Sequence, residues 1–423
     1  MEDKTDIRFT CAYLAFLNTF DLEIDKDINW DAAVEKLKAK SIDQHLKDFE
    51  TAGKFLLSEG IRQQYFRLRI DGFSISLPHL DEDCSINSKI EVDTFLTIYR
   101  EFGIGTLLFN VHLENCTVDG LIFLIRCFQD RFKVHVDGPD FIRLDSNNIF
   151  IGNILVEYRD KISAAFGSEQ ETPHIFKSRC VEIRGLSSSE IQDPQSLLDR
   201  FPRQMYGLLT ADEGWRFVPE DVATERTNMK WRTRDFFCAV PWSLCVLLID
   251  LAGGDAHRKY IESQNLLCNK FGYPIEEYFT FKPRIAGLNH GPLLNLEIAS
   301  VQYYMLDRVL SKVAESKSKS IRGFLAQREE LIKALSKLAQ VKIQEVGILG
   351  QNIGRTMGLA NRIEEVTQRL EEIERTLIIK YNQRINYLML ILTVFGIIFA
   401  IFSASDSIKQ FFRLVYSLLR GLL

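Results

Sequence analysis

Apolar and polar residues alternate with a period of two in two segments of the N-terminal half of the chain. One segment reads TLLFNVHLE (residues 106–114) and the other reads YFRLRIDGFSISL (65–77). This alternation is typical of strands with one buried face. The shorter apolar runs KVHV (133–136) and CVEIRGL (180–186) predict further strands.

Helical spacing follows the first of these strands. The segment reads TVDGLIFLIRCFQ (117–129), and Thr117 stands where a helix N-cap is expected. Because strands alternate with helices, we predict an α/β domain over residues 1–185.

Residues 186–292 are predicted to form a helical subregion of the same domain. This subregion contains FFCAVPWSLCVLLI (236–249), which has 14 residues, includes Pro241 and is flanked by Asp235 and Asp250. The run is too short to span a bilayer. We therefore interpret it as a buried helix of the soluble part.

Residues 293–386 contain no proline and are rich in Glu, Lys, Arg, Leu and Ala, which predicts one long stalk helix. Within it, apolar residues recur in steps of four and three, as in the heptads of a coiled coil. They are Leu359, Ile363, Val366, Leu370, Ile373 and Leu377. This heptad seam predicts homo-oligomerisation through the stalk; the alternative is an amphipathic helix packed on its own domain.

Four glycines share one face of the predicted stalk, at steps of three, four and four residues. They are Gly347, Gly350, Gly354 and Gly358. A bare helix face permits close packing against another helix, as small-residue patterns do in membranes. The alternative role is a hinge, because missing side chains permit bending.

Residues 387–404 contain no charged side chain over 18 positions. At a helical rise of 1.5 Å this run is about 27 Å long, close to the thickness of a bilayer core. We therefore predict a transmembrane helix with the lipid bilayer as its partner. The first ten residues, MEDKTDIRFT, lack the apolar core of a signal peptide. We accordingly expect a single-pass protein of the cell membrane whose N-terminal domain is cytoplasmic.

The tail, residues 405–423, combines an apolar stripe with the basic residues Lys409, Arg413 and Arg420. This pattern is typical of a basic amphipathic helix lying at the membrane surface. The alternative is a short second span, with SASDS (403–407) as the turn.

Composition and motifs narrow the function. The net charge of −5 gives no reason to expect a nucleic-acid partner, and the eight scattered cysteines predict buried, reduced thiols. No phosphate-binding loop, nucleophile elbow or zinc motif is found, so we predict no catalytic residue, metal site or cofactor. An enzyme is therefore the least favoured class.

Two polar segments could hold a ligand. The segment PHLDEDC carries His79, Asp81, Asp83 and Cys84, which could bind a metal, although a polar surface turn is the favoured interpretation. The second segment is ERTNMKWRTRDFF (225–237), where cations beside an aromatic ring could bind an anion or a nucleotide. Its candidate ligands are Arg226, Lys230, Trp231, Arg232 and Arg234. A solvated face or a subunit contact is the favoured interpretation, and Asp212 and Glu213 could equally be ion-pair partners of these cations.

At the start of the membrane run, an Asn is followed at +3 by Met, at +6 and +7 by Leu-Thr, and at +12 and +13 by Ile-Phe. The residues are Asn386, Met389, Leu392, Thr393, Ile398 and Phe399. This pattern resembles the first membrane helix of CorA-type magnesium channels. The resemblance implies a CorA-like architecture: an α/β cytosolic domain, a long helical stalk and a C-terminal transmembrane helix. The Gly-Met-Asn signature of the family is absent, and the corresponding region reads SIKQFF. No selectivity-filter residue is therefore assigned.

Divergent CorA-like proteins without the signature act as membrane effectors in prokaryotic defence, gated by a nucleotide messenger. The resemblance thus implies an oligomeric channel or pore-forming effector whose cytosolic domain senses a ligand. One stripe of the membrane helix is compatible with a pore lining. It consists of Met389, Leu392, Gly396, Ala400 and Ser403. The alternative is a membrane-anchored scaffold that oligomerises through its stalk.

Overall fold

The computed structural model divides the chain into two compact units. We call Met1–Arg308 with Ala334–Ile363 the sheet unit, and Val309–Lys333 with Glu364–Leu423 the helical unit. The structure describes residues 7–22, 30–37, 65–77, 89–99, 102–138, 148–167, 175–187, 191, 194–227, 236–240, 245–249, 251, 266, 270, 290–316, 320–340 and 353–421.

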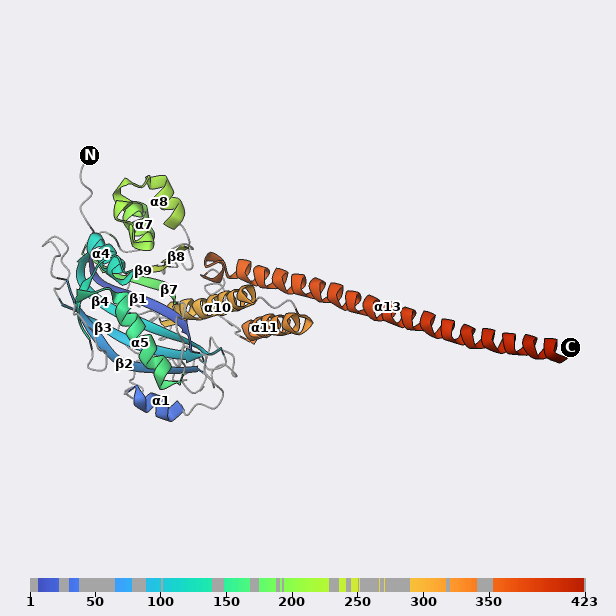
Figure 1. Ribbon diagram of the computed structural model, residues 1–423. Coiled ribbons are helices and arrows are strands. Elements are labelled where there is room, and N and C mark those ends of the chain that lie inside the picture. The colour runs from blue at the N-terminus through green and yellow to red at the C-terminus, as the bar shows by residue number, and fades with distance from the viewer. Residues whose placement is uncertain are drawn as a thin grey trace. The chain divides into compact units, whose positions relative to one another are not determined.

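A nine-stranded sheet forms the framework of the described part of the sheet unit, in the order β6-β5-β2-β3-β4-β1-β7-β9-β8 (Figure 1). Neighbouring strands are antiparallel except β7 and β9, which run parallel. The strands are β1 (Arg8–Asp21), β2 (Tyr65–Ser76), β3 (Lys89–Tyr99), β4 (Ile104–Thr117), β5 (Val134–Asp137), β6 (Asn148–Ile149), β7 (Phe176–Leu186), β8 (Phe236–Val240) and β9 (Cys245–Ile249). The strands expected at 65–77, 106–114, 133–136 and 180–186 are thereby confirmed.

Both faces of the sheet are covered, which the central strand β1 shows most clearly. Leu14 and Phe16 point into one apolar core, while Ala15 and Leu17 point into a second core on the opposite face. A strand buried on both sides reads as a continuous apolar run instead of an alternating one.

The first core packs helices against one face of the sheet. They are α1 (Trp30–Lys36), α4 (Val118–Phe128), α5 (Ile151–Ala165), α6 (Pro194–Arg200) and α7 (Pro202–Thr210). The 3₁₀ helix η2 (Glu213–Phe217) and helix α8 (Glu220–Thr227) follow α7. Thr117 caps α4 as expected, since its hydroxyl accepts a hydrogen bond of 3.1 Å from the Gly120 amide.

The predicted helix over residues 236–249 is wrong, because this segment contains strands β8 and β9. Its ten described residues pair as an antiparallel hairpin, and β9 also pairs with β7. A short apolar run is compatible with either a buried helix or a buried strand. Here the run forms strands, because β9 pairs with the edge of β7 that β1 leaves open.

The single stalk helix predicted over residues 293–386 is also wrong. Helix α10 (His290–Glu315) is followed by α11 (Ile321–Gln340) and then by α13 (Leu359–Gly421). Gly358 explains why α13 begins where it does. Its φ of +75° is left-handed, which stops the helical turn at residues 353–356 before α13 starts.

The expected glycine face therefore does not exist as one helical stripe. A Cβ on Gly354 would meet the Leu359 side chain of the same chain at 3.4 Å, and one on Gly358 would meet nothing within 4 Å. Gly347 and Gly350 lie outside the described residues.

In the helical unit, α11 and α13 pack against each other antiparallel. The Arg328 Nε atom lies 2.9 Å from the Glu374 carboxylate, and the Lys380 amine lies 5.6 Å from the centre of the Phe324 ring. As the residue number falls along α11, it rises along α13, so the two helices run antiparallel.

Part of the heptad seam is buried in the region where α11 and α13 contact each other. Val366, Ile373 and Leu377 are buried within this single chain. This packing matches the alternative interpretation, in which an amphipathic helix packs on its own chain. These three side chains are therefore already covered and leave less of the seam for contact with a partner subunit.

Candidate functional site

The C-terminal part of α13 is an exposed apolar helix, long and apolar enough to span a membrane. None of its most apolar 18-residue window is buried by the described residues. A core helix of a soluble protein would be mostly buried, so this exposure needs another apolar environment. A membrane-spanning segment at residues 387–404 fits both the length and the exposure.

The two sides of this helix differ. Met389, Leu392, Gly396, Ala400 and Ser403 fall within roughly a quarter of the helix circumference. Met389 is 61% exposed and Leu392 68% exposed, and a Cβ on Gly396 would meet nothing within 4 Å. The expected pore-facing stripe is thus present and uncovered by the described part of this chain.

The side opposite to the stripe is bulky. Its large side chains are Leu390, Val394, Ile397, Ile398 and Ile401, all exposed. Only the C-terminal half of the stripe, at Gly396, Ala400 and Ser403, has small side chains, and that half is the preferred side for close packing against other helices.

The one hydroxyl in the middle of the segment is satisfied internally. Thr393 Oγ1 donates a hydrogen bond of 2.8 Å to the Met389 carbonyl. Polar groups in a bilayer need such internal partners, because lipid offers none. The segment can therefore enter a membrane without an unsatisfied threonine.

Helix α13 continues through residues 403–407 to Gly421 without a turn. The alternative of a second span that turns back at SASDS is therefore wrong. The predicted surface helix is not observed either, because the bend that it needs after the span is absent from α13. Exposed apolar side chains, including Phe411, Phe412, Leu418 and Leu419, still accompany Lys409, Arg413 and Arg420 in the tail.

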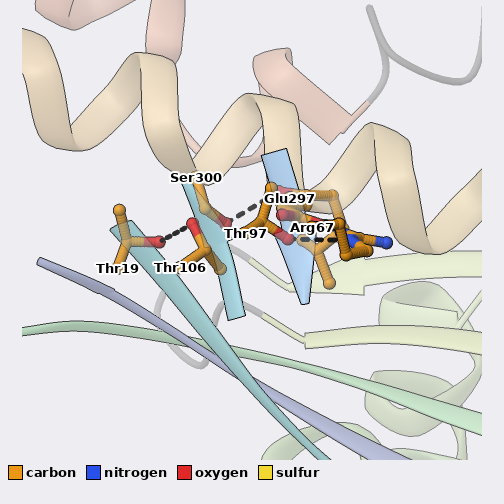
Figure 2. Close-up of polar contacts among 7 residues, drawn as sticks. Thr19, Arg67, Thr97, Thr106, Glu297 and Ser300 are labelled. Carbon is orange, nitrogen blue, oxygen red and sulfur yellow. Dashed lines mark hydrogen bonds and ion pairs between the residues drawn. The ribbon is translucent and has the colours of Figure 1, made fainter. Parts of the chain in front are cut away.

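A second polar constellation lies inside the sheet unit, where α10 covers the sheet (Figure 2). Arg67, Thr97, Thr106 and Thr19 are direct neighbours across β2, β3, β4 and β1. All four are buried. They place a row of polar side chains on the face of the sheet that α10 covers.

An ion pair joins this row to α10. Arg67 Nη2 contacts Glu297 Oε2, and both side chains have no exposed surface. Arg67 Nε also donates a hydrogen bond of 2.7 Å to the Thr97 hydroxyl. Burying two charges costs several kcal/mol each, so such a pair contributes less to stability than to the register of the packed elements.

Two further contacts fix the same helix on the sheet. The Ser178 and Ser300 hydroxyls lie 2.8 Å apart, and Arg308 Nη1 lies 2.6 Å from the Asp21 carboxylate. Since Glu297, Ser300 and Arg308 follow at helical spacing, one face of α10 carries all three contacts. These three contacts therefore set the position of α10 along the sheet.

A third group gathers at the other end of the same face. The Tyr13 and His112 rings stack at 4.5 Å, and the Arg184 guanidinium lies 5.2 Å from the Tyr13 ring centre. Cys11 Sγ lies 3.7 Å from His112 Nε2. Burial raises the pKa of the Cys11 thiol, which disfavours the thiolate that a nucleophile needs. This cluster lacks an activated cysteine.

Sequence reasoning missed both clusters on this face. The available signal was the phase of the alternation, because Arg67 and Tyr13 occupy positions opposite to those that face the first core. Which of these positions would be covered depends on α10, and the sequence pattern does not give that information.

The predicted ligand segment is mostly outside the described residues. Arg226 is exposed at the end of α8, whereas Lys230, Trp231, Arg232 and Arg234 are not described. The acidic residues considered as partners have other roles. Asp212 caps η2 through the Gly214 amide at 2.9 Å, and Glu213 pairs with Arg126.

The metal and thiol predictions can be checked only in part. His79, Asp81, Asp83 and Cys84 lie outside the described residues, and the described residues contain no group of three metal-ligating side chains. Five of the described cysteines are free; Cys116, Cys127, Cys180 and Cys245 are buried, and Cys11 is partly exposed. Burial raises the pKa of Cys116 and of Cys127 to about 12. Buried, reduced thiols are therefore confirmed for these four cysteines.

Comparisons of the chain with family models, with curated proteins and with solved structures give no match.

Proposed function

We propose that the chain is a subunit of a homo-oligomeric membrane channel or pore, lined by the stripe of Met389, Leu392, Gly396, Ala400 and Ser403. The observation that carries the proposal is the exposed membrane-length helix, whose stripe has large side chains at Met389 and Leu392 and small ones at Gly396, Ala400 and Ser403. A lone helix encloses no path for ions, so a pore requires several copies around a common axis. Slim faces let helices approach closely, and rings of Met and Leu can close a pore by excluding water.

In this proposal the sheet unit is a cytoplasmic sensor that controls the pore. An anion or a nucleotide is the proposed ligand class, following the resemblance to CorA-type channels and to defence effectors. Helix α10 is the proposed route of control. It is seated on the sheet by polar contacts that depend on register, and the chain leads from it towards the membrane segment.

A membrane-anchored scaffold is the second candidate, because one exposed membrane-length helix suffices as an anchor and no pore is needed. Part of the heptad seam is buried within the same chain. The seam therefore offers less surface for assembling a ring and, equally, for the stalk contact through which a scaffold would oligomerise.

Ion flux through the full chain in liposomes separates the two functions. Leu392→Asn places a polar side chain on the stripe and is expected to raise flux, because a hydrated ring no longer excludes water. Leu390→Asn is the matched control. It makes the same change about 200° away on the helix, facing lipid or neighbouring helices.

If neither the unmodified chain nor Leu392→Asn exceeds the flux of protein-free liposomes, the pore is refuted and the scaffold is favoured. Equal flux for the two variants would refute the assignment of the stripe to the pore.

A further inference from the structure

A cavity of about 250 Å³ lies in the sheet unit between helices α1 and α5, above strand β2. Leu37, Ile70, Ile162 and Ala165 give it mainly apolar walls. Figure 1 shows α1 and α5 as neighbours on the side of the sheet away from α10. The cavity is therefore separated by the sheet from the buried ion pair.

Two lysines line this apolar cavity. Lys36 ends α1 and Lys161 lies on α5, and both are exposed. Neither forms an ion pair within the described part of the chain, and the lining contains no carboxylate. Lys177, by contrast, lies 2.7 Å from the Asp130 carboxylate. Two uncompensated cations beside one hollow favour an anionic occupant.

The remaining polar group of the lining is already engaged. The Tyr158 hydroxyl donates a hydrogen bond of 2.5 Å to the Asp71 carbonyl. Among the described residues, the lining offers no amide and no free hydroxyl that could recognise the edge of a nucleobase. The occupant therefore needs an apolar body, with its polarity confined to an anionic head.

We propose that this cavity binds a single-chain amphiphilic anion, with the carboxylate or phosphate at Lys36 and Lys161 and the apolar body against Ile70 and Ile162. At roughly 30 Å³ per non-hydrogen atom, the volume holds a body of about eight such atoms. A two-chain lipid is too large for this space. The proposal is independent of the proposed pore, because binding is measured directly.

Octanoate is the probe, titrated by calorimetry into the full chain in lipid nanodiscs, with empty nanodiscs subtracted. Octyl phosphate tests the second head group. Acetate lacks the apolar body, octanol lacks the charge and adenosine monophosphate carries a base, and we expect weaker binding of all three. Tighter binding of adenosine monophosphate than of octanoate would overturn the proposal.

Two variants test the site. Lys36→Gln with Lys161→Gln should weaken octanoate binding about tenfold, since an exposed charge contact contributes a few-fold each. Lys89→Gln with Lys133→Gln is the matched control, because it removes the same charge outside the cavity. Ala164→Phe should abolish binding by filling the cavity, whereas Val156→Phe, on α5 but outside the lining, should not.

No saturable binding of octanoate or octyl phosphate to the unmodified chain would overturn the proposal. Equal affinities of the two double-lysine variants would overturn it as well, because the bound anion would then lie elsewhere.

Discussion

The buried pair between Arg67 and Glu297 allows a quantitative test of how α10 is held on the sheet. Glu297→Gln keeps the size of the side chain but removes the charge that faces the Arg67 guanidinium. Both side chains are fully buried, so the arginine would remain uncompensated in a medium of low polarity. Breaking a buried pair from one side costs about 3–5 kcal/mol of unfolding free energy.

Removing both charges should cost much less. Arg67→Met with Glu297→Leu fills similar volume with apolar atoms, a change that is often neutral or stabilising in buried pairs. The Thr97 hydroxyl loses its 2.7 Å contact with Arg67, which offsets part of the gain. We expect the double variant to lie within about 2 kcal/mol of the unmodified chain.

An exposed ion pair between β2 and β3 supplies a matched control. Arg69 lies 2.8 Å from Asp93, but these side chains are 36% and 45% exposed. Because water solvates both partners, Asp93→Asn should cost at most about 1 kcal/mol.

Urea unfolding of the full chain in nanodiscs, followed by tryptophan emission, measures these differences. All four tryptophans (30, 215, 231 and 242) belong to the sheet unit, so their emission reports on it. A Glu297→Gln variant as stable as the Asp93→Asn variant would refute the reasoning. So would an Arg67→Met/Glu297→Leu variant that is less stable than the Glu297→Gln variant.

Three further predictions concern local features of the sheet unit. Thr117→Ala should cost about 1 kcal/mol in the same urea assay, because α4 loses its N-cap, and Thr117→Ser should retain most of it. Gly358→Ala should lower the free energy of unfolding by about 1–2 kcal/mol, because the φ of Gly358 is +75°. Gly354→Ala, measured in the same urea assay, should raise it by up to about 1 kcal/mol. Burial raises the pKa of Cys116 and Cys127 from 9.0 to about 12. The thiols should thus resist alkylation at pH 8, and stability should be full below pH 9 and fall as the pH rises from 9 towards 12; a serine double variant should lose this part of the pH dependence.

Features that depend only on residues close together in the chain can be predicted from the sequence. The uncharged run at 387–404 predicts a membrane-length helix because the length of a span is a local property. The alternation in β2 and β4 and the cap at Thr117 are equally local, and the structure has them where they were expected.

Residues 236–249 form strands instead of a helix because β9 pairs with an edge of β7, and this contact between distant segments is not visible in the local sequence. The end of the predicted stalk likewise depends on tertiary contacts. The heptad spacing describes an apolar seam but not what covers it, and here α11 folds back along α13.

The buried ion pair shows the same limit most clearly. Arg67 and Glu297 are separated by 230 positions in the chain. Alternation places Arg67 on the face of β2 opposite to Leu68 and Ile70, which point into the first core. Whether that face meets water or a helix is decided by the packing of α10, and this long-range packing turns an arginine expected at a surface into part of a buried pair.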